Sequence, residues 1–376
     1  MKKLIALLAS LTALSCCCAS CFLMAEQIKP MHSIVASAED TEIITSGTCG
    51  ENLTWNFEES TGTLTISGTG AMEDFIYDDG SERFPFWCTH FQNVENVVIE
   101  DGVTTIGKGA FFDCGSLTSV TIPDSVTTIG EVAFGWCESL TSVTIPDSVT
   151  AIGECAFFDC SALESIVIPN SVTTIGDSAF SGTLWLETKR NENPLVIING
   201  ILIDGKTCED DIVIPDSVTA IGDLAFYTCT TLTSVTIPDS VTTIGDYAFG
   251  WCESLTSVTI PNSVTAIGYE AFSYCSALES IVIPNSVTTI GEGAFYDCSA
   301  LTSVTIPDSV TTMGESAFSD CSALESITIP DSVTAIEDYA FYGCKSLTSV
   351  TIPDSVTAIE DYAFYGCKSL TSVTIP

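Results

Sequence analysis

The chain has 376 residues, of which 49 are acidic and 10 are basic, so its formal net charge is −39 at pH 7. This charge excludes a nucleic-acid binder that contacts phosphates, and it argues against attraction to anionic lipid. Because 46% of the residues are hydrophobic, the chain is too apolar to be a disordered acidic tail, and we expect a folded, very acidic protein.

Residues 1–38 are typical of a signal peptide. Lys2 and Lys3 precede an apolar run over residues 4–14, and the Ala-Ser-Ala sequence at 36–38 is typical of a cleavage site. We therefore expect a secreted or cell-surface protein that contacts no membrane beyond this signal region. Two alternatives remain open: an uncleaved anchor that runs on past Met24, and lipidation of one cysteine among Cys16, Cys17, Cys18 and Cys21.

Residues 39–98 precede the regular part of the sequence, and we expect them to form an N-terminal, β-rich cap. Two cysteines, Cys49 and Cys88, lie in this segment. In an exported protein such a pair can form a disulfide, and the sequence leaves their redox state open.

From residue 99 to residue 376 the sequence repeats every 23 residues, and the last two repeats, 331–353 and 354–376, are identical. A period of this length predicts a solenoid in which each coil contacts only its neighbours. The chain stops at Pro376 without a polar capping repeat, so we expect either a fragment or a following domain.

One repeat predicts the path of one coil. Ser119 and Thr121 alternate with apolar residues, which indicates a half-buried strand, and Pro123 ends it. A short helical or 3₁₀ segment is expected around Ala133 and Phe134. Stacked coils then form a parallel sheet with strands about 4.8 Å apart.

The repeat also carries a family resemblance. The string AFxxCxxLxxVxIPxxVxxIG, as at 133–153, resembles the leucine-rich repeats of BspA-like bacterial surface proteins, and the resemblance covers residues 100–376. The segment with Trp55 and residues 62–72 is similar to the family's N-terminal region. The resemblance implies a leucine-rich-repeat solenoid with a binding or adhesion role at the cell surface, and it does not name the ligand.

Ten cysteines occupy the same repeat position. Their fixed spacing predicts a ladder of buried thiols, because a disulfide between adjacent coils would pull pairs out of the stack and zinc needs converging ligands. These ladder cysteines are Cys114, Cys137, Cys160, Cys229, Cys252, Cys275, Cys298, Cys321, Cys344 and Cys367.

Two acidic rows recur along the repeats, one beginning at Asp124 and the other at Glu131. Stacked carboxylates could bind calcium, but acidic residues beside a turn also cap free N–H groups. Capping is favoured because Asn170, Asn262 and Asn285 substitute in the first row. We therefore expect no metal, although calcium dependence stays open.

The outward strand positions form the broadest candidate binding face. They carry Ser and Thr, which are also simply good strand residues. The candidate residues are Ser119, Thr121, Ser142, Thr144, Ser234, Thr236, Ser257, Thr259, Ser303 and Thr305.

An irregular insertion at about 184–211 interrupts the repeats. Asn199-Gly200 between two apolar runs predicts a β-hairpin. The insertion either contacts a ligand or only restarts the stack. Its candidate contact residues are Lys189, Arg190, Asn199, Gly200 and Lys206.

Catalysis has little support, since His32 and His90 are the only histidines and no motif for nucleophilic, phosphate or metal chemistry occurs. We expect no catalytic residues and no cofactor. The sequence predicts a monomeric, non-catalytic scaffold that binds an extracellular protein or glycan, with no nucleic-acid partner. The alternative is an accessory or spacer module of an extracellular carbohydrate-degrading complex.

Overall fold

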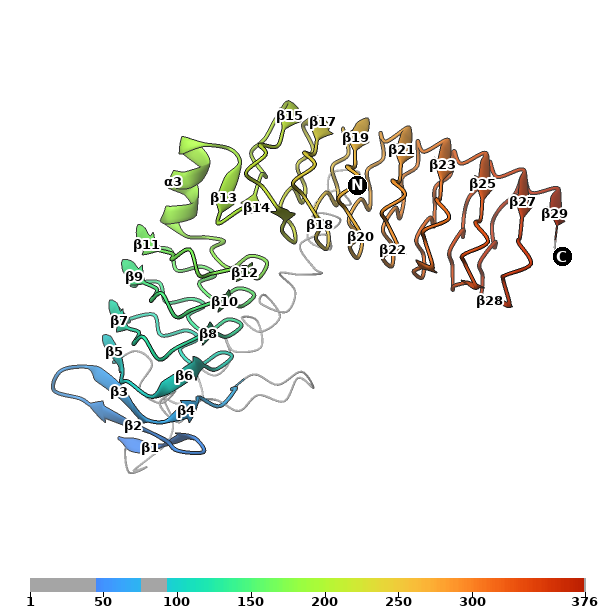
Figure 1. Ribbon diagram of the computed structural model, residues 1–376. Helices are drawn as coiled ribbons and strands as arrows, with labels where there is room; N and C mark the ends of the chain where they lie inside the picture. The colour runs from blue at the N-terminus through green and yellow to red at the C-terminus, as the bar shows by residue number, and fades with distance from the viewer. Residues whose placement is uncertain (1–44, 76–92, 375–376) are drawn as a thin grey trace, which may run out of the picture. The chain divides into compact units, whose positions relative to one another are not determined.

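The computed structural model describes residues 45–75 and 93–374. The expected signal peptide, Cys88 and both histidines lie outside these residues. The chain divides into two compact units, Met1–Thr188 and Lys189–Pro376. Within each unit, successive coils follow one another along the chain (Figure 1).

The first unit begins with an antiparallel meander that continues into the coils. Strands β1 (Ser46–Gly50), β2 (Leu53–Glu58) and β3 (Thr63–Gly68) bury Trp55 and Leu64 on one side. Strand β3 then pairs in parallel with β5 (Asn96–Ile99), which pairs with β7 (Ser119–Thr121). The meander therefore covers the open edge of the first coil.

Each later coil contributes one strand to each of two sheets. In the first unit β9 (Ser142–Thr144) pairs with β11 (Ser165–Val167). The second sheet has the order β12-β10-β8-β6-β4. Its strands are β4 (Gly70–Ala71), β6 (Val103–Ile106), β8 (Thr128–Ile129), β10 (Ala151–Ile152) and β12 (Thr174–Ile175).

The second unit repeats this plan over more coils. A hairpin of β13 (Val196–Ile198) and β14 (Ile201–Asp204) begins one sheet, which continues through β16 (Ala220–Ile221), β18 (Thr243–Ile244), β20 (Ala266–Ile267), β22 (Thr289–Ile290) and β24 (Thr312–Met313). Strands β26 (Ala335–Ile336) and β28 (Ala358–Ile359) follow as a separate pair.

The other sheet of the second unit has eight parallel strands. They are β15 (Asp210–Val213), β17 (Leu232–Thr236), β19 (Ser257–Thr259), β21 (Ser280–Val282), β23 (Ser303–Thr305), β25 (Ser326–Thr328), β27 (Ser349–Thr351) and β29 (Ser372–Thr374). From Asp211 onward, residues 23 apart pair directly, as with Ser234 and Ser257. This register confirms the predicted parallel solenoid.

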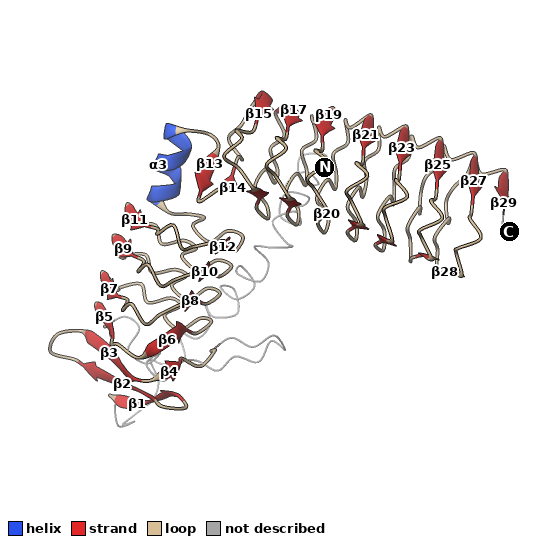
Figure 2. Cartoon of the chain, viewed as in Figure 1, coloured by secondary structure: helices blue, strands red, loops and turns tan. Residues whose placement is uncertain are grey.

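The segment expected to be short helical or 3₁₀ is instead a run of turns (Figure 2). Two residues of each segment are left-handed, as Val132 (φ 54°) and Trp136 (φ 58°) show, and such residues cannot continue a right-handed helix. Alternate amides donate to the next coil, so that Phe134 N donates to Ala156 O at 2.8 Å. These turn segments therefore form a third side of the solenoid, along which neighbouring coils are joined by hydrogen bonds.

Stacked phenylalanines and cysteines fill the core. In the second unit, Phe226 stacks on Phe249 with ring centroids 4.9 Å apart and an 8° angle between planes. The ladder thiols lie beside these rings, and Cys298 Sγ donates to the carbonyl of Phe272 at 3.2 Å. The predicted burial of the ten ladder cysteines is confirmed for nine, and Cys367 is half-buried.

Candidate binding surface

The ten predicted Ser and Thr residues lie on the outer face of the strands. Nine of these side chains are exposed and Ser234 is half-buried, while the valine between each pair points inward. Two of the serines bond to the preceding coil: Ser119 Oγ donates to Asn96 Oδ1 at 2.7 Å, and Ser234 Oγ donates to Asp211 Oδ1 at 2.6 Å. The structure thus brings the predicted residues together as rows along the sheets of each unit.

Three valines interrupt the rows where other coils carry threonine. Val167 is 56% exposed, Val213 is 72% exposed and Val282 is 77% exposed. Val213 pairs with Thr236, and Val282 pairs with both Thr259 and Thr305, which places the latter two valines in one row of the eight-stranded sheet. Val213 was not predicted from the sequence, although it lies two residues before Pro215, at the position that Thr236 and Thr259 occupy in the following coils.

Other hydroxyls that recur on the coils join neighbouring coils. Thr302 Oγ1 donates to the carbonyl of Glu279 at 3.2 Å, and Ser309 Oγ donates to the carbonyl of Val287 at 2.7 Å. Both contacts recur in several other coils at the same spacing. These side chains are therefore part of the stacking, whereas the outward Ser and Thr rows form its surface.

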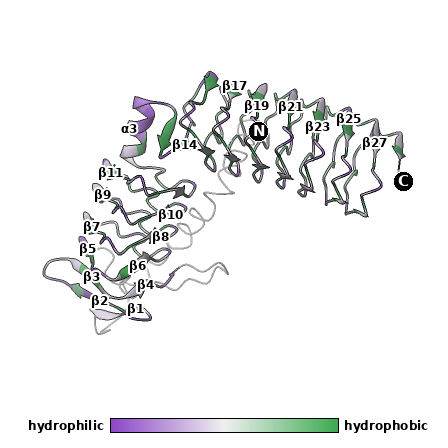
Figure 3. Cartoon of the chain, viewed as in Figure 1, coloured by the Kyte–Doolittle hydropathy of each residue, from purple (hydrophilic) through white to green (hydrophobic). Residues whose placement is uncertain are grey.

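The irregular insertion contains one helix and the hairpin. Helix α3 (Leu184–Glu192) is the only helix in the described part of the chain and is hydrophilic over most of its length (Figure 3). Thr183 occupies the ladder position, donates to Phe180 O at 2.7 Å and accepts from Leu186 N at 3.2 Å. This hydroxyl caps the helix where a cysteine would continue the coil.

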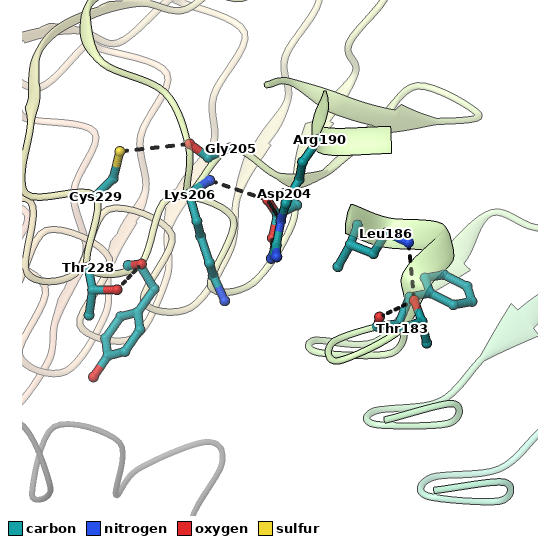
Figure 4. A network of polar contacts seen from close by, with 10 residues as sticks. Thr183, Leu186, Arg190, Asp204, Gly205, Lys206, Thr228 and Cys229 are labelled. Atoms are coloured by element: carbon teal, nitrogen blue, oxygen red, sulfur yellow. Dashed lines mark hydrogen bonds and ion pairs between the residues drawn. The ribbon is translucent and has the colours of Figure 1, made fainter. Parts of the chain in front are cut away.

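The insertion's basic residues mostly contact the protein itself (Figure 4). Arg190 Nε and Nη2 donate to the two carboxylate oxygens of Asp204 at 2.9 and 2.7 Å, and Asp204 is 3% exposed. Lys206 N donates to the same carboxylate at 3.3 Å, while Lys189 Nζ lies 2.8 Å from Glu192. Arg190 therefore holds the hairpin to the helix.

The hairpin turn follows the conformation that its sequence requires. Asn199 and Gly200 both have positive φ, at 51° and 83°, as in a type I′ turn. Strand β14 then pairs with β16, so this hairpin supplies the first strands of the second unit's sheet.

Two acidic side chains of the row that begins at Glu131 accept hydrogen bonds from amides of the next coil, instead of capping their own turn segment as expected. Asp223 Oδ1 accepts from Asp246 N at 2.7 Å, and Asp246 Oδ1 accepts from Tyr269 N at 2.7 Å. Burial raises the pKa of Asp223, and the hydrogen bond from the Asp246 amide opposes that rise. Among the described residues, no three His, Cys, Asp or Glu side chains are placed to hold a metal ion.

No helix within residues 45–75 and 93–374 combines the length and apolar character needed to span a membrane. Curated proteins give no match to the sequence.

Solved structures include several similar bacterial proteins. A leucine-rich repeat protein from Eubacterium ventriosum is 29% identical, covers 87% of this chain and 96% of its own length, and has a TM-score of 0.53. One from Bacteroides ovatus is 29% identical over 87% of this chain and 82% of its own, with a TM-score of 0.45. A leucine rich cell surface protein from Faecalibacterium prausnitzii is 27% identical over 90% and 96%, with a TM-score of 0.42.

The family described as "BspA type Leucine rich repeat region" matches in six copies over residues 86–200, 205–325 and 311–376. These matches span most of the chain and all of its regular coils. The chain therefore belongs to the BspA-type leucine-rich repeat family.

Proposed function

We propose that this protein is a non-catalytic scaffold of the cell surface or the secreted fraction that binds an extracellular macromolecule along its outer strand face. The observation that supports the proposal is the pair of exposed valines on the eight-stranded sheet. They stand in a row that is otherwise threonine, and neither covers the core. An apolar residue that the coil does not need for stacking is available for a partner.

The arrangement of this face fits a protein partner. Val213 and Val282 lie three strands apart, which is about 14 Å at about 4.8 Å per strand. Burying each valine on binding contributes about 1.5 kcal/mol or more. The hydroxyl rows around them then form the polar rim that surrounds apolar anchors in protein interfaces.

A carboxylate accompanies one of the valines on the same strand face. Asp211 precedes Val213 by two residues in β15, and both side chains are exposed. The pKa of Asp211 is lowered by hydrogen bonds from the hydroxyls of Ser234 and Thr233, so this group stays ionised in mildly acidic surroundings. Strands β15 to β29 of this sheet contain no Lys or Arg, so the face favours a neutral or basic partner.

The test compares binding by the full chain and by the double variant V213T/V282T. The variant introduces the residue that other coils carry, so we expect the fold to be unchanged. Immobilised chains are exposed to a panel of purified extracellular matrix proteins and, separately, to a glycan array. For ligands that the natural chain binds, we expect a loss of affinity of about ten-fold.

The control is T243V, which adds an apolar residue to the exposed Thr243 of β18 on the other sheet. This control is expected to bind like the natural chain. The proposal fails if V213T/V282T retains full affinity for every bound ligand. Binding to glycans alone would support the accessory-module alternative over the protein scaffold.

A further inference from the structure

One coil of the second unit reverses the order of an acid and a tyrosine. The preceding coil reads Gly-Asp-Tyr-Ala-Phe at 245–249, whereas this coil reads Gly-Tyr-Glu-Ala-Phe at 268–272. The second residue of each pair is left-handed, with φ of 51° at Tyr247 and 44° at Glu270. Tyr247 is 5% exposed, so the reversal places the carboxylate of Glu270 at a position where the neighbouring coil buries an aromatic ring.

Tyrosine rings of the same coil and of the two adjacent coils lie near this carboxylate. The rings of Tyr247 and Tyr269 lie 5.0 Å apart at 72°, and those of Tyr274 and Tyr296 lie 5.2 Å apart at 66°. Trp251 stacks on Tyr274 at 4.0 Å. We call Tyr247, Trp251, Tyr269, Glu270, Tyr274 and Tyr296 the aromatic–carboxylate cluster.

Small residues on the adjacent coils accommodate the cluster. A Cβ on Gly293 would come within 2.7 Å of Glu270 Cγ. Ser273 stands where four other coils of the second unit carry a tyrosine: Tyr227, Tyr296, Tyr342 and Tyr365. The cluster therefore fits against the small residues beside it, and its composition differs from that of the other coils.

The first unit contains an apolar counterpart of this cluster. Both units carry the sequence Gly-Trp-Cys-Glu-Ser-Leu, at 135–140 and at 250–255. Around Trp136, the positions that correspond to Tyr247, Glu270 and Ser273 hold Val132, Cys155 and Phe158, which form a small hydrophobic cluster with Phe112. The coil therefore packs at this place without a carboxylate, so stacking does not require Glu270.

The charge of Glu270 has no basic counterpart in this part of the sequence. No Lys, Arg or His occurs between Lys206 and Lys345. Burial raises the pKa of the Glu270 carboxyl, the hydroxyls of Tyr269, Ser273 and Tyr247 oppose that rise, and the charge of Glu292 adds to it. A bound cation would favour the ionised form and offset its partial desolvation.

We propose that the aromatic–carboxylate cluster binds an arginine side chain from a basic segment of a partner protein. A guanidinium group is planar and weakly hydrated, so it can stack on Tyr or Trp rings while it donates two hydrogen bonds to one carboxylate. The half-buried rings of Tyr269 and Tyr296 and the half-buried Glu270 offer both kinds of contact. This site is separate from the strand face and does not depend on the function proposed for it.

The test uses the full chain and a short peptide probe, acetyl-Gly-Arg-Gly-Arg-Gly-amide. Its twin carries citrulline, which has the shape of arginine without the charge. Isothermal titration calorimetry in about 0.15 M NaCl limits diffuse attraction to the acidic surface. We expect the arginine peptide to bind and the citrulline peptide to bind at least about ten-fold more weakly.

The decisive variant is Y269D/E270Y, which restores the order of the preceding coil without changing the net charge. Stacked tyrosines at this position already occur in the fold, since Tyr339 and Tyr362 stack at 5.2 Å. We expect the variant to lose about ten-fold or more of the arginine-peptide affinity. E315Q, which removes an exposed charge two coils away, is the control and is expected to change it less than about two-fold.

The proposal is overturned if Y269D/E270Y binds the arginine peptide as the natural chain does, or if E315Q weakens binding equally. Equal binding of the citrulline peptide would also refute it. Should the double variant not fold by circular dichroism, E270Q decides the question with the same expected loss. The strand-face variant V213T/V282T is expected to retain full peptide binding.

Discussion

The side chain at the ladder position differs between the regular coils and the coil at which the insertion begins. A cysteine there buries a small apolar side chain whose thiol donates to the phenylalanine carbonyl of the preceding coil, as Cys321 does to Phe295 at 3.2 Å. At Thr183 the hydroxyl instead bonds to its own coil and accepts a helix amide. The coil pattern ends at this residue and helix α3 begins.

The ladder thiols give the protein a predicted sensitivity to alkaline pH. Burial raises the pKa of Cys275, Cys298 and Cys321 well above the ordinary value of about 8.5. Above that pH the unfolded chain loses thiol protons that the folded chain retains. The free energy of unfolding should therefore fall by up to about 1.4 kcal/mol per pH unit for each such thiol.

Urea unfolding between about pH 7 and pH 10 measures this slope, because the ordinary thiol pKa lies within that interval. The variant C298A removes one buried thiol and should make the slope above the ordinary thiol pKa shallower by up to about 1.4 kcal/mol per pH unit. An unchanged slope in C298A would mean that this thiol titrates alike in the folded and unfolded chain.

The elements of the insertion differ in how well the sequence predicts them. The turn at Asn199-Gly200 could be predicted because a two-residue hairpin needs two positive φ angles, which these residues adopt easily. Helix α3 was not predicted, although Thr183 followed by a polar, helix-forming stretch is a typical helix start.

The turn segments show a different limit of sequence reasoning. Val132, Cys155 and Leu224 are all left-handed, yet none of these residue types favours that conformation. Hydrogen bonds to the next coil hold the backbone there, as in Val132 N to Glu154 O at 2.8 Å. A preference that arises only in the stack cannot be read from one repeat, so a short helix was the wrong expectation.

The contact between Arg190 and Asp204 is predicted to stabilise the start of the second unit. Asp204 is almost fully buried and forms two hydrogen bonds with the guanidinium, so D204N leaves a partly buried charge without its partner. We expect a loss of about 2–3 kcal/mol in the free energy of unfolding. Urea unfolding and hydrogen exchange of β14 and β16 measure it.

K189A provides the matched control in the same helix. The ion pair of Lys189 and Glu192 is exposed, with side chains 39% and 59% accessible, so its removal should change stability by less than about 0.5 kcal/mol. Equal effects of D204N and K189A would contradict a structural role for the buried pair.

At the scale of the whole molecule, the repeat predicted the architecture and left the functional positions open. Pairing of residues 23 apart followed from the sequence, because a slip by one residue would turn the apolar side of every strand outward. The repeat could not predict the division after Thr188 or the surroundings of Glu270. Both features arise where the sequence departs from the repeat, and the structure at such a position depends on the residues of the neighbouring coils.

The proposed binding sites lie at departures from the repeat. Val213 and Val282 interrupt the threonine row of the strand face, and Tyr269-Glu270 places its acidic residue second, whereas the other coils of the second unit place it first. The regular coils around these residues hold them rigidly in place. We therefore expect binding to reside where the second unit differs from its own repeat.

The most direct measurement is the affinity of a chain in which V213T, V282T and Y269D/E270Y together make the second unit regular. We predict a thermal unfolding midpoint close to that of the natural chain, because each new residue is one that neighbouring coils already carry. We also predict a loss of about ten-fold or more in affinity for the arginine peptide and for each protein bound by the natural chain. Retention of full affinity by this regular, folded chain would contradict the claim and assign binding to the repeat itself.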